Sequence, residues 1–387
     1  MLRKGDFLRY NIIFVMKNFF WHLPTEIVFG AGALSHLKVK APKFGRKALV
    51  VTGKKFARET GLLDEIKSLL SEGGVAVEIF AGANENPTTG IIMEGTKICQ
   101  EKGCDFVVGV GGGSAMDTAK GIAILITNPG GLQAYFGTDR IINTPLPVIA
   151  IPTTAGSGSE VTRYAVIVDQ NDGLKKTVSS VSICPKLALV QPSLTLSLSS
   201  FLTASTGLDA FCHAVEGGLS QRITPLTLVL AKGSVEIIKK ALPCAVSDLT
   251  NIEAREKMSL AALMSGMVIN QTGTIIGHGM GYPLTLNYRV QHGSASSLVL
   301  PAIFEFLAKK GFTKRITEIT GWKEPALAWK EFCQRIGLPT SLKEVGVKKE
   351  ELEDLAREGF RNSQRSIENL GLKLKEEDLY EIYCGAF

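Results

Sequence analysis

The chain has 387 residues, 45% of them hydrophobic and 21% charged, and a formal net charge of +6. This length allows two domains, and the composition is ordinary for a soluble globular protein. Lysine and arginine are scattered along the chain rather than gathered in a basic stripe, so the sequence gives no support to nucleic-acid binding.

The N-terminus carries the apolar run Ile12-Ile13-Phe14-Val15-Met16, which is too short to span a membrane. Lys17 interrupts the run and no small-residue cleavage site follows, so we expect no signal peptide. Met16 is an alternative start, which would make residues 1–15 an extension. The seven cysteines show no C-x-x-C spacing, which is typical of reduced thiols. We therefore expect a cytoplasmic protein without membrane contact.

The first half of the chain alternates short apolar runs with amphipathic stretches. Because strands that alternate with helices form parallel sheets covered by helices, we expect an α/β domain over residues 16–190. The expected strands are 47–52, 75–80, 105–110 and 147–151, and the expected helices are 62–70, 90–102 and 114–126.

The second half has apolar residues at three- and four-residue spacing, which predicts helices at 204–219, 226–240, 252–270 and 297–308. Pro225, Pro243, Pro283 and Pro301 are expected to separate these helices. The predicted architecture is therefore an α/β domain followed by an all-helical domain over residues 191–387.

A glycine-rich turn follows the strand expected at 105–110. Gly111, Gly112 and Gly113 with Ser114 open the next helix, where free N–H groups and the helix dipole favour a phosphate. The turn matches neither G-x-G-x-x-G nor the P-loop, and a tight connection would explain it equally well. A second loop, with Thr153 and Thr154, follows the strand at 147–151. Two such loops at the carboxyl ends of parallel strands favour a dinucleotide site.

Three of the five histidines form a spaced pattern with one aspartate. Asp209 and His213 are four residues apart, which places both on one helix face, and His278 and His292 follow in glycine-containing segments. One carboxylate and three imidazoles are a plausible ligand set for a divalent transition metal. The alternative is a surface or capping pair with two unrelated histidines.

With these motifs assembled, the chain resembles the iron-containing alcohol dehydrogenases. The matching pieces occur in family order: PTEIVFGAG at 24–32, GGGSAMDTAK at 111–120, PTTAGSGSE at 152–160, STGLDAFCHAVEG at 205–217, and the segments around His278 and His292. The tail beyond residue 301 carries no such motif.

The resemblance implies a metal-binding helical domain and a dinucleotide-binding α/β domain. The metal, Fe(II) or Zn(II), would be held by Asp209, His213, His278 and His292. A nicotinamide dinucleotide would lie in the cleft between the domains, and a homodimer is the family expectation. The cofactor-side positions implied in this way are Gly111, Gly112, Gly113, Ser114, Asp117, Thr153, Thr154 and Lys175.

Two positions refine these expectations. Family members that use NAD tend to have an aspartate where this chain has Gly53, so we expect NADP(H), with NAD(H) less favoured; Lys54 or Lys55 would offset the charge of the 2′-phosphate. Many relatives also carry a second histidine four residues after the one matched by His278. Tyr282 stands there, which puts the usual proton relay in doubt.

The expected function is a metal-dependent alcohol dehydrogenase or aldehyde reductase that acts on a small primary alcohol or diol. The metal would act as a Lewis acid toward the substrate oxygen while the nicotinamide exchanges a hydride. The alternative is an enzyme similar to dehydroquinate synthase or glycerol dehydrogenase that uses NAD and a metal. A metal- or nucleotide-binding regulatory protein is a third, non-catalytic class.

Overall fold

The computed structural model describes residues 18–387. The expectations for the apolar run at 12–16 and for a start at Met16 lie outside these residues.

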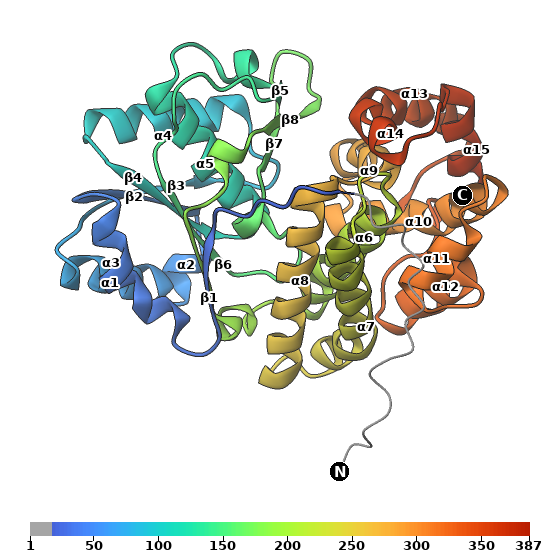
Figure 1. The fold of residues 1–387 in the computed structure, drawn as a ribbon, viewed down its shortest axis with the longest axis horizontal. Coiled ribbons are helices and arrows are strands. Elements are labelled where there is room, and N and C mark those ends of the chain that lie inside the picture. Colours follow the sequence, from blue (N-terminus) through green and yellow to red (C-terminus); the bar gives the residue numbers. More distant parts are fainter. Residues whose placement is uncertain (1–17) are drawn as a thin grey trace.

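Six parallel strands form the main sheet, in the order β1-β9-β6-β4-β2-β3 (Figure 1). Their bounds are β1 (Glu26–Phe29), β2 (Lys47–Gly53), β3 (Ala76–Ala83), β4 (Phe106–Gly111), β6 (Val148–Pro152) and β9 (Leu187–Val190). A smaller sheet joins β7 (Tyr164–Val168) antiparallel to β8 (Lys175–Ser179), and β8 parallel to β5 (Gly137–Thr138).

Helices cover both faces of the main sheet. Because side chains alternate along a strand, Leu49 and Val51 of β2 pack with one helix pair, whereas Val50 packs with the helices on the other face. The first pair is α4 (Thr89–Glu101) and α5 (Gly113–Thr127), and the opposite face carries α1 (Leu37–Lys40), α2 (Phe56–Glu59) and α3 (Leu62–Glu72).

Helices make up the rest of the chain after β9. They are α6 (Ser200–Leu219), α7 (Pro225–Ser247), α8 (Ile252–Thr272), α9 (Ile276–Asn287), α10 (His292–Lys309), α11 (Thr313–Thr320), α12 (Pro325–Arg335), α13 (Leu352–Asn362), α14 (Gln364–Leu370) and α15 (Glu376–Ala386). Short 3-10 segments occur at Ala33–His36, Ala41–Lys43, Leu132–Tyr135, Ser159–Val161, Val181–Ile183, Pro192–Thr195, Lys343–Val345 and Lys349–Glu351. The expected fold class, a parallel α/β part followed by a helical part, is confirmed. The domain boundaries at residues 16, 190 and 387 stay a prediction.

The prolines do not all separate helices as expected. Pro225 stands at the start of α7, but Pro243, Pro283 and Pro301 lie inside α7, α9 and α10. The expectation was wrong for these three, because a proline removes only one helix hydrogen bond and packing of a buried helix outweighs that loss.

Helix α9 was not expected at all, because its glycines and Pro283 have low helix propensity. These glycines instead let α9 approach its neighbours closely. A Cβ atom at Gly279 would lie 2.2 Å from the Ser363 hydroxyl oxygen, and one at Gly281 would lie 2.9 Å from the backbone nitrogen of Ser296. The segment is therefore helical because of what packs against it.

Among the described residues, no single helix is long and apolar enough to cross a membrane. The pair α8 and α9 passes that test of length and composition when taken together, with a bend of 112° between the two helices.

Candidate active site

A cleft of about 830 Å³ lies between the sheet part and the helical part. One wall contains the glycine turn after β4 and the loop after β6, and the other contains residues of α6, α9, α10 and α13–α14. The expected metal ligands and all of the expected cofactor-side residues line this cleft: Gly53, Gly111, Gly112, Gly113, Ser114, Asp117, Thr153, Thr154, Lys175, Asp209, His213, His278 and His292.

Helix α6 presents Asp209 and His213 at the cleft. The Ser199 side chain caps the helix by accepting a hydrogen bond from the backbone N–H of Leu202. Both functional side chains are nearly buried, and the Nε2 atom of His213 lies 3.9 Å from the Oδ1 atom of Asp209. The four-residue spacing thus brings the two groups to one face, as expected.

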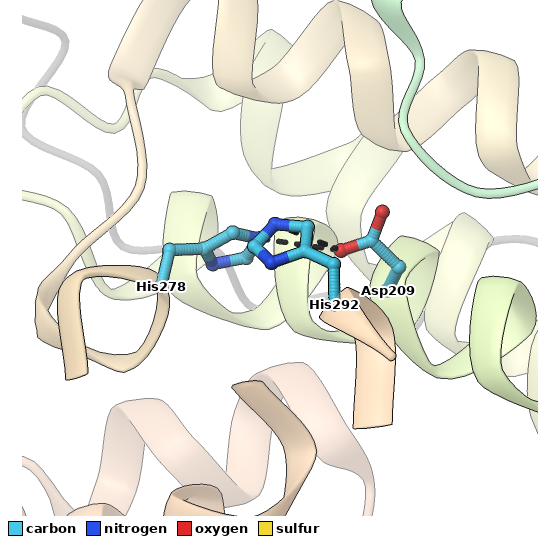
Figure 2. Close-up of side chains that lie close together, drawn as sticks. All are labelled: Asp209, His278 and His292. Atoms are coloured by element: carbon cyan, nitrogen blue, oxygen red, sulfur yellow. Dashed lines mark ion pairs between the residues drawn. The ribbon is translucent and has the colours of Figure 1, made fainter. Parts of the chain in front are cut away.

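Helices α9 and α10 bring the other two histidines to the same oxygen. Figure 2 shows His278 and His292 converging on Asp209. The Nε2 atom of His278 lies 3.4 Å from Asp209 Oδ1, and that of His292 lies 3.9 Å from it. The His292 side chain is 33% exposed, against 4% for His278, so the group opens to the cleft on the His292 side.

The Nδ1 atoms of His213 and His278 each face an acceptor oxygen, which holds the rings in place. His278 Nδ1 lies 2.6 Å from an oxygen of Glu216, which is fully buried, and His213 Nδ1 lies 3.4 Å from the carbonyl oxygen of Gly156. An acceptor at Nδ1 favours the tautomer with a free lone pair on Nε2. Both rings therefore direct a potential metal-binding atom toward Asp209.

These atoms fit a divalent metal. Asp209 Oδ1 and His278 Nε2 are buried and have no hydrogen-bond partner within residues 18–387, a costly arrangement unless an ion joins them. The ligand atoms of three side chains all lie within 4.8 Å of one another: those of Asp209, His278 and His292. The fourth candidate, His213, has its Nε2 atom 3.9 Å from Asp209 Oδ1. Tetrahedral ligands at about 2.1 Å from a metal are about 3.4 Å apart, so small shifts would complete the set.

The charges around the site also suit a cation. Burial works to raise the pKa of Asp209, but the neighbouring imidazoles outweigh burial and hold this pKa well below its usual range. Burial lowers the pKa of His213 to about 4, so this ring is neutral at pH 7, which is the form that binds a metal. Burial also disfavours protonation of His278, but Glu216 and Asp209 outweigh burial and raise its pKa to about 10. A metal therefore competes with a proton at His278.

The glycine turn joins β4 to the start of α5. Gly111 has a φ of 145°, a conformation that favours glycine, and no side chain caps the first N–H groups of α5. A Cβ atom at Gly113 would lie 2.9 Å from Ser157, so the turn and the loop after β6 approach closely. The backbone N–H of Thr153 donates to the carbonyl oxygen of Gly111 over 3.0 Å. The two loops therefore form one surface with free donors for an anion.

Lys175 and Tyr282 lie together beside the histidines. The Nζ atom of Lys175 stands 5.1 Å from the centre of the Tyr282 ring, and this ring centre is 5.6 Å from that of His292. Burial lowers the pKa of Lys175 to about 8 and raises that of the Tyr282 phenol above its usual range. Tyr282 is therefore a poor proton donor at neutral pH.

Gly53 and Asp117, two of the expected cofactor-side residues, differ in whether their positions are open to the cleft or already occupied by contacts within the protein. Gly53 ends β2 and leaves the cleft open, because a Cβ atom there would touch only the carbonyl oxygen of Ala83, at 3.6 Å. Both carboxylate oxygens of Asp117 already accept hydrogen bonds within the protein, from the Ser159 hydroxyl at 2.7 Å and the Val166 N–H at 2.9 Å. The geometry gives Asp117 a role in joining α5 to β7.

Sequence reasoning missed Glu216 and Lys120. Glu216 follows Asp209 by seven residues and His213 by three, so helical spacing alone would have placed it on the same face. Lys120 ends the motif at 111–120, but its burial was not expected, because a lysine on a helix is normally exposed.

Two family models match the two parts of the chain. Residues 24–192 match the model described as iron-containing alcohol dehydrogenase, and residues 203–387 match the C-terminal model of the Fe-containing alcohol dehydrogenase family. The chain belongs to the iron-containing alcohol dehydrogenase family. The family resemblance carried by the motifs is therefore confirmed, and the chain is a member of an oxidoreductase family.

Similar members of the iron-containing alcohol dehydrogenase family span nearly the whole chain. The NAD-dependent methanol dehydrogenase of Bacillus methanolicus is 34% identical over 89% of this chain and 93% of its own. The 1,3-propanediol dehydrogenase of Citrobacter freundii is 31% identical over 96% of this chain and 99% of its own. These relatives do not support the expected preference for NADP(H), since the first is NAD-dependent.

Solved structures of the family share the fold. A 1,3-propanediol oxidoreductase superposes with a TM-score of 0.90 and 31% identity, covering 96% of this chain and 100% of that one. An iron-containing alcohol dehydrogenase from Thermotoga maritima gives a TM-score of 0.85 and 36% identity, covering 95% and 99%.

Proposed function

We propose that this chain is a metal-dependent alcohol dehydrogenase or aldehyde reductase that transfers a hydride between NADP(H) and a small primary alcohol or diol. The observation that carries the proposal is the convergence of Asp209, His213, His278 and His292 in a cleft whose other wall is the glycine turn. The names of the methanol and 1,3-propanediol dehydrogenases support small alcohols or diols as substrates.

The four side chains would hold Fe(II) or Zn(II), since three imidazoles and a carboxylate suit both. When bound, such a metal supplies Lewis acidity toward the oxygen of the substrate. Glu216 and the Gly156 carbonyl keep the rings of His278 and His213 in place. The turn at 111–114 would hold the phosphates of the dinucleotide, which supplies the hydride when it is bound. Because burial raises the pKa of Tyr282 and makes it a poor proton donor, the proton on the substrate oxygen would come from water in the cleft.

The preference for NADP(H) rests on Gly53. Its position at the end of β2 lacks the carboxylate that would bind a ribose 2′-hydroxyl and repel a 2′-phosphate, and the exposed Lys54 and Lys55 follow it. A homodimer and a cytoplasmic location also stay predictions.

Anaerobic assays test the function. Purified protein is stripped of metal, reloaded with Fe(II) or Zn(II), and offered a panel of aldehydes with NADPH or NADH. We expect reduction only after reloading, and faster reduction with NADPH. His278→Ala should abolish the metal-dependent activity; a variant that keeps full activity after chelation would show that the site is assigned wrongly.

The alternatives predict other outcomes in the same assay. An enzyme similar to dehydroquinate synthase would show no net oxidation of NADPH with any simple aldehyde, and an enzyme similar to glycerol dehydrogenase would prefer NADH with polyols. A regulatory protein would bind the dinucleotide without turnover. Membership of the alcohol dehydrogenase family favours turnover with simple aldehydes.

A further inference from the structure

Arg365 lines the cleft on its helical side and has no carboxylate partner among the described residues. Arg365 of α14 reaches across to the small sheet, where it donates from Nη2 to the Ser179 hydroxyl over 3.1 Å, and its guanidinium carbon lies 5.0 Å from the centre of the Tyr164 ring. Within residues 18–387, no carboxylate oxygen lies within ion-pair distance of Arg365 or of Arg361, which lines the same part of the cleft.

The contacts of Arg365 position its guanidinium but leave most of its N–H donors available. The guanidinium lies over the Tyr164 ring, and the bond to Ser179 uses one of its five N–H donors. A partly buried guanidinium held in this way is arranged to bind a carboxylate, sulfonate or phosphonate through two parallel hydrogen bonds.

The surroundings of Arg365 are positive. Burial raises the pKa of the Tyr164 phenol, and the charges of Arg365, Arg163 and Arg222 act against that rise. The acidic groups that line the cleft are engaged elsewhere. Glu85 accepts from the Gln291 side chain at 2.8 Å, while Asp117 and Asp209 have the contacts described above. None of these carboxylates lies within ion-pair distance of Arg365, so among residues 18–387 no carboxylate competes with an incoming anion for direct contact with the guanidinium.

The small sheet connects Arg365 with the metal ligands. Strand β8 begins at Lys175, which stacks on the Tyr282 ring beside His292, and ends at Ser179, which bonds to Arg365. The cofactor phosphates are expected elsewhere, at the glycine turn and at Gly53 on the main sheet. A substrate that reaches from the histidines toward Arg365 would therefore lie along the small sheet, inside the cleft that both line.

We propose that Arg365 recognises an anionic group at the far end of the substrate, so that the enzyme acts on short aldehydes bearing a carboxylate or similar anion and on the corresponding alcohols. This inference rests on the proposed function. The aldehyde carbon receives the hydride of NAD(P)H, its oxygen receives a proton, and the anionic group is unchanged.

The test compares two substrates of equal chain length, 4-oxobutanoate and butanal, on the metal-loaded enzyme. We expect the wild type to have a kcat/KM at least about tenfold higher for 4-oxobutanoate. Arg365→Gln should lower the ratio of the two kcat/KM values by about tenfold, toward one, and Arg365→Lys by less, because a point charge remains. The KM for NADPH should not change. The control is Arg357→Gln on α13, where the arginine pairs with Asp354 and Glu376; this variant should keep the wild-type ratio.

Several results would overturn the inference. If Arg365→Gln and Arg365→Lys slow both substrates equally while their melting temperatures match the wild type, Arg365 only joins the two walls of the cleft. A raised KM for NADPH would assign it to the cofactor. In both cases the proposed function stands. If neither aldehyde is reduced by any metal-loaded form, the proposed function fails together with the inference.

Discussion

At the scale of single residues, Glu216 is the carboxylate that contacts the ring of a candidate metal ligand, His278, from behind. It is fully buried, and its contact with Nδ1 of His278 sets which nitrogen of that ring faces Asp209. A buried carboxylate in this position also makes the imidazole a better metal ligand.

Replacing Glu216 tests this influence. Glu216→Gln keeps an acceptor oxygen but removes the charge, so we expect the affinity for Zn(II) to fall about 10- to 100-fold. Competition with a chelator of defined affinity measures the change. Glu236→Gln, an exposed position on α7, is the matched control and should bind Zn(II) as the wild type does. Equal affinities for Glu216→Gln and wild type would remove Glu216 from the site.

Gly53 is the residue on which cofactor choice depends. Gly53→Asp introduces a carboxylate where a Cβ atom meets no close contact, so the fold should tolerate it. We expect the kcat/KM for NADPH to fall at least about tenfold and that for NADH to rise, because the carboxylate repels a 2′-phosphate and binds a 2′-hydroxyl. Steady-state rates with both cofactors measure the switch. A wild type that already prefers NADH would contradict the assignment of NADP(H).

At the scale of elements, Lys120 joins α5 to the segment after β6 and to the start of β7. Its buried ammonium group donates to the carbonyl oxygens of Ser159, Thr162 and Tyr164 at 2.8, 3.0 and 2.8 Å, and to two hydroxyl groups. Burial lowers the pKa of Lys120, and nearby Asp117 acts against this. The same segment follows the loop that supplies Thr153 and Thr154, so Lys120 supports the cofactor wall of the cleft.

Lys120→Met would leave these acceptors buried without a donor. We expect the free energy of unfolding to fall by about 3–5 kcal/mol, measured by urea denaturation, because several charge-assisted hydrogen bonds are lost together. Lys97→Met on α4, where the lysine side chain is 77% exposed, should change it by less than about 1 kcal/mol. Similar stabilities for the two variants would show that the bonds of Lys120 contribute little.

At the scale of the whole molecule, the candidate metal site joins helices that are far apart in sequence. Asp209 and His213 lie on α6, His278 on α9 and His292 on α10. A metal that binds only the folded chain stabilises it by about 4 kcal/mol at a free concentration a thousandfold above its dissociation constant.

Removing the metal should therefore lower the melting temperature by about 5 °C, and adding Zn(II) should restore it. Calorimetry of the metal-loaded and chelated protein measures the shift. The variant His278→Ala should melt at the same temperature before and after chelation. A wild type whose melting temperature does not respond to chelation would contradict a structural contribution of the metal.

Much of the fold was predictable because its strands and helices show as patterns of apolar residues over short stretches of the chain. The strands expected at 47–52 and 105–110 correspond to β2 and β4, since buried parallel strands are continuous apolar runs. Strand β9, with four residues, and the β7–β8 pair were not expected, because short strands leave weak patterns. Helix α9 was missed because its glycines serve close packing rather than helix propensity.

The sequence alone determined the fold class, the glycine turn and the candidate ligands, because these depend on the type and spacing of residues that are close together in the chain. Tertiary structure decided what surrounds them. Glu216 meets His278 across 62 residues of chain, and Arg365 meets Ser179 across 186. No local pattern records such contacts, since they depend on how whole helices pack against the sheets. Only the folded molecule could therefore show how the histidines are oriented and where an unpaired cation faces the cleft.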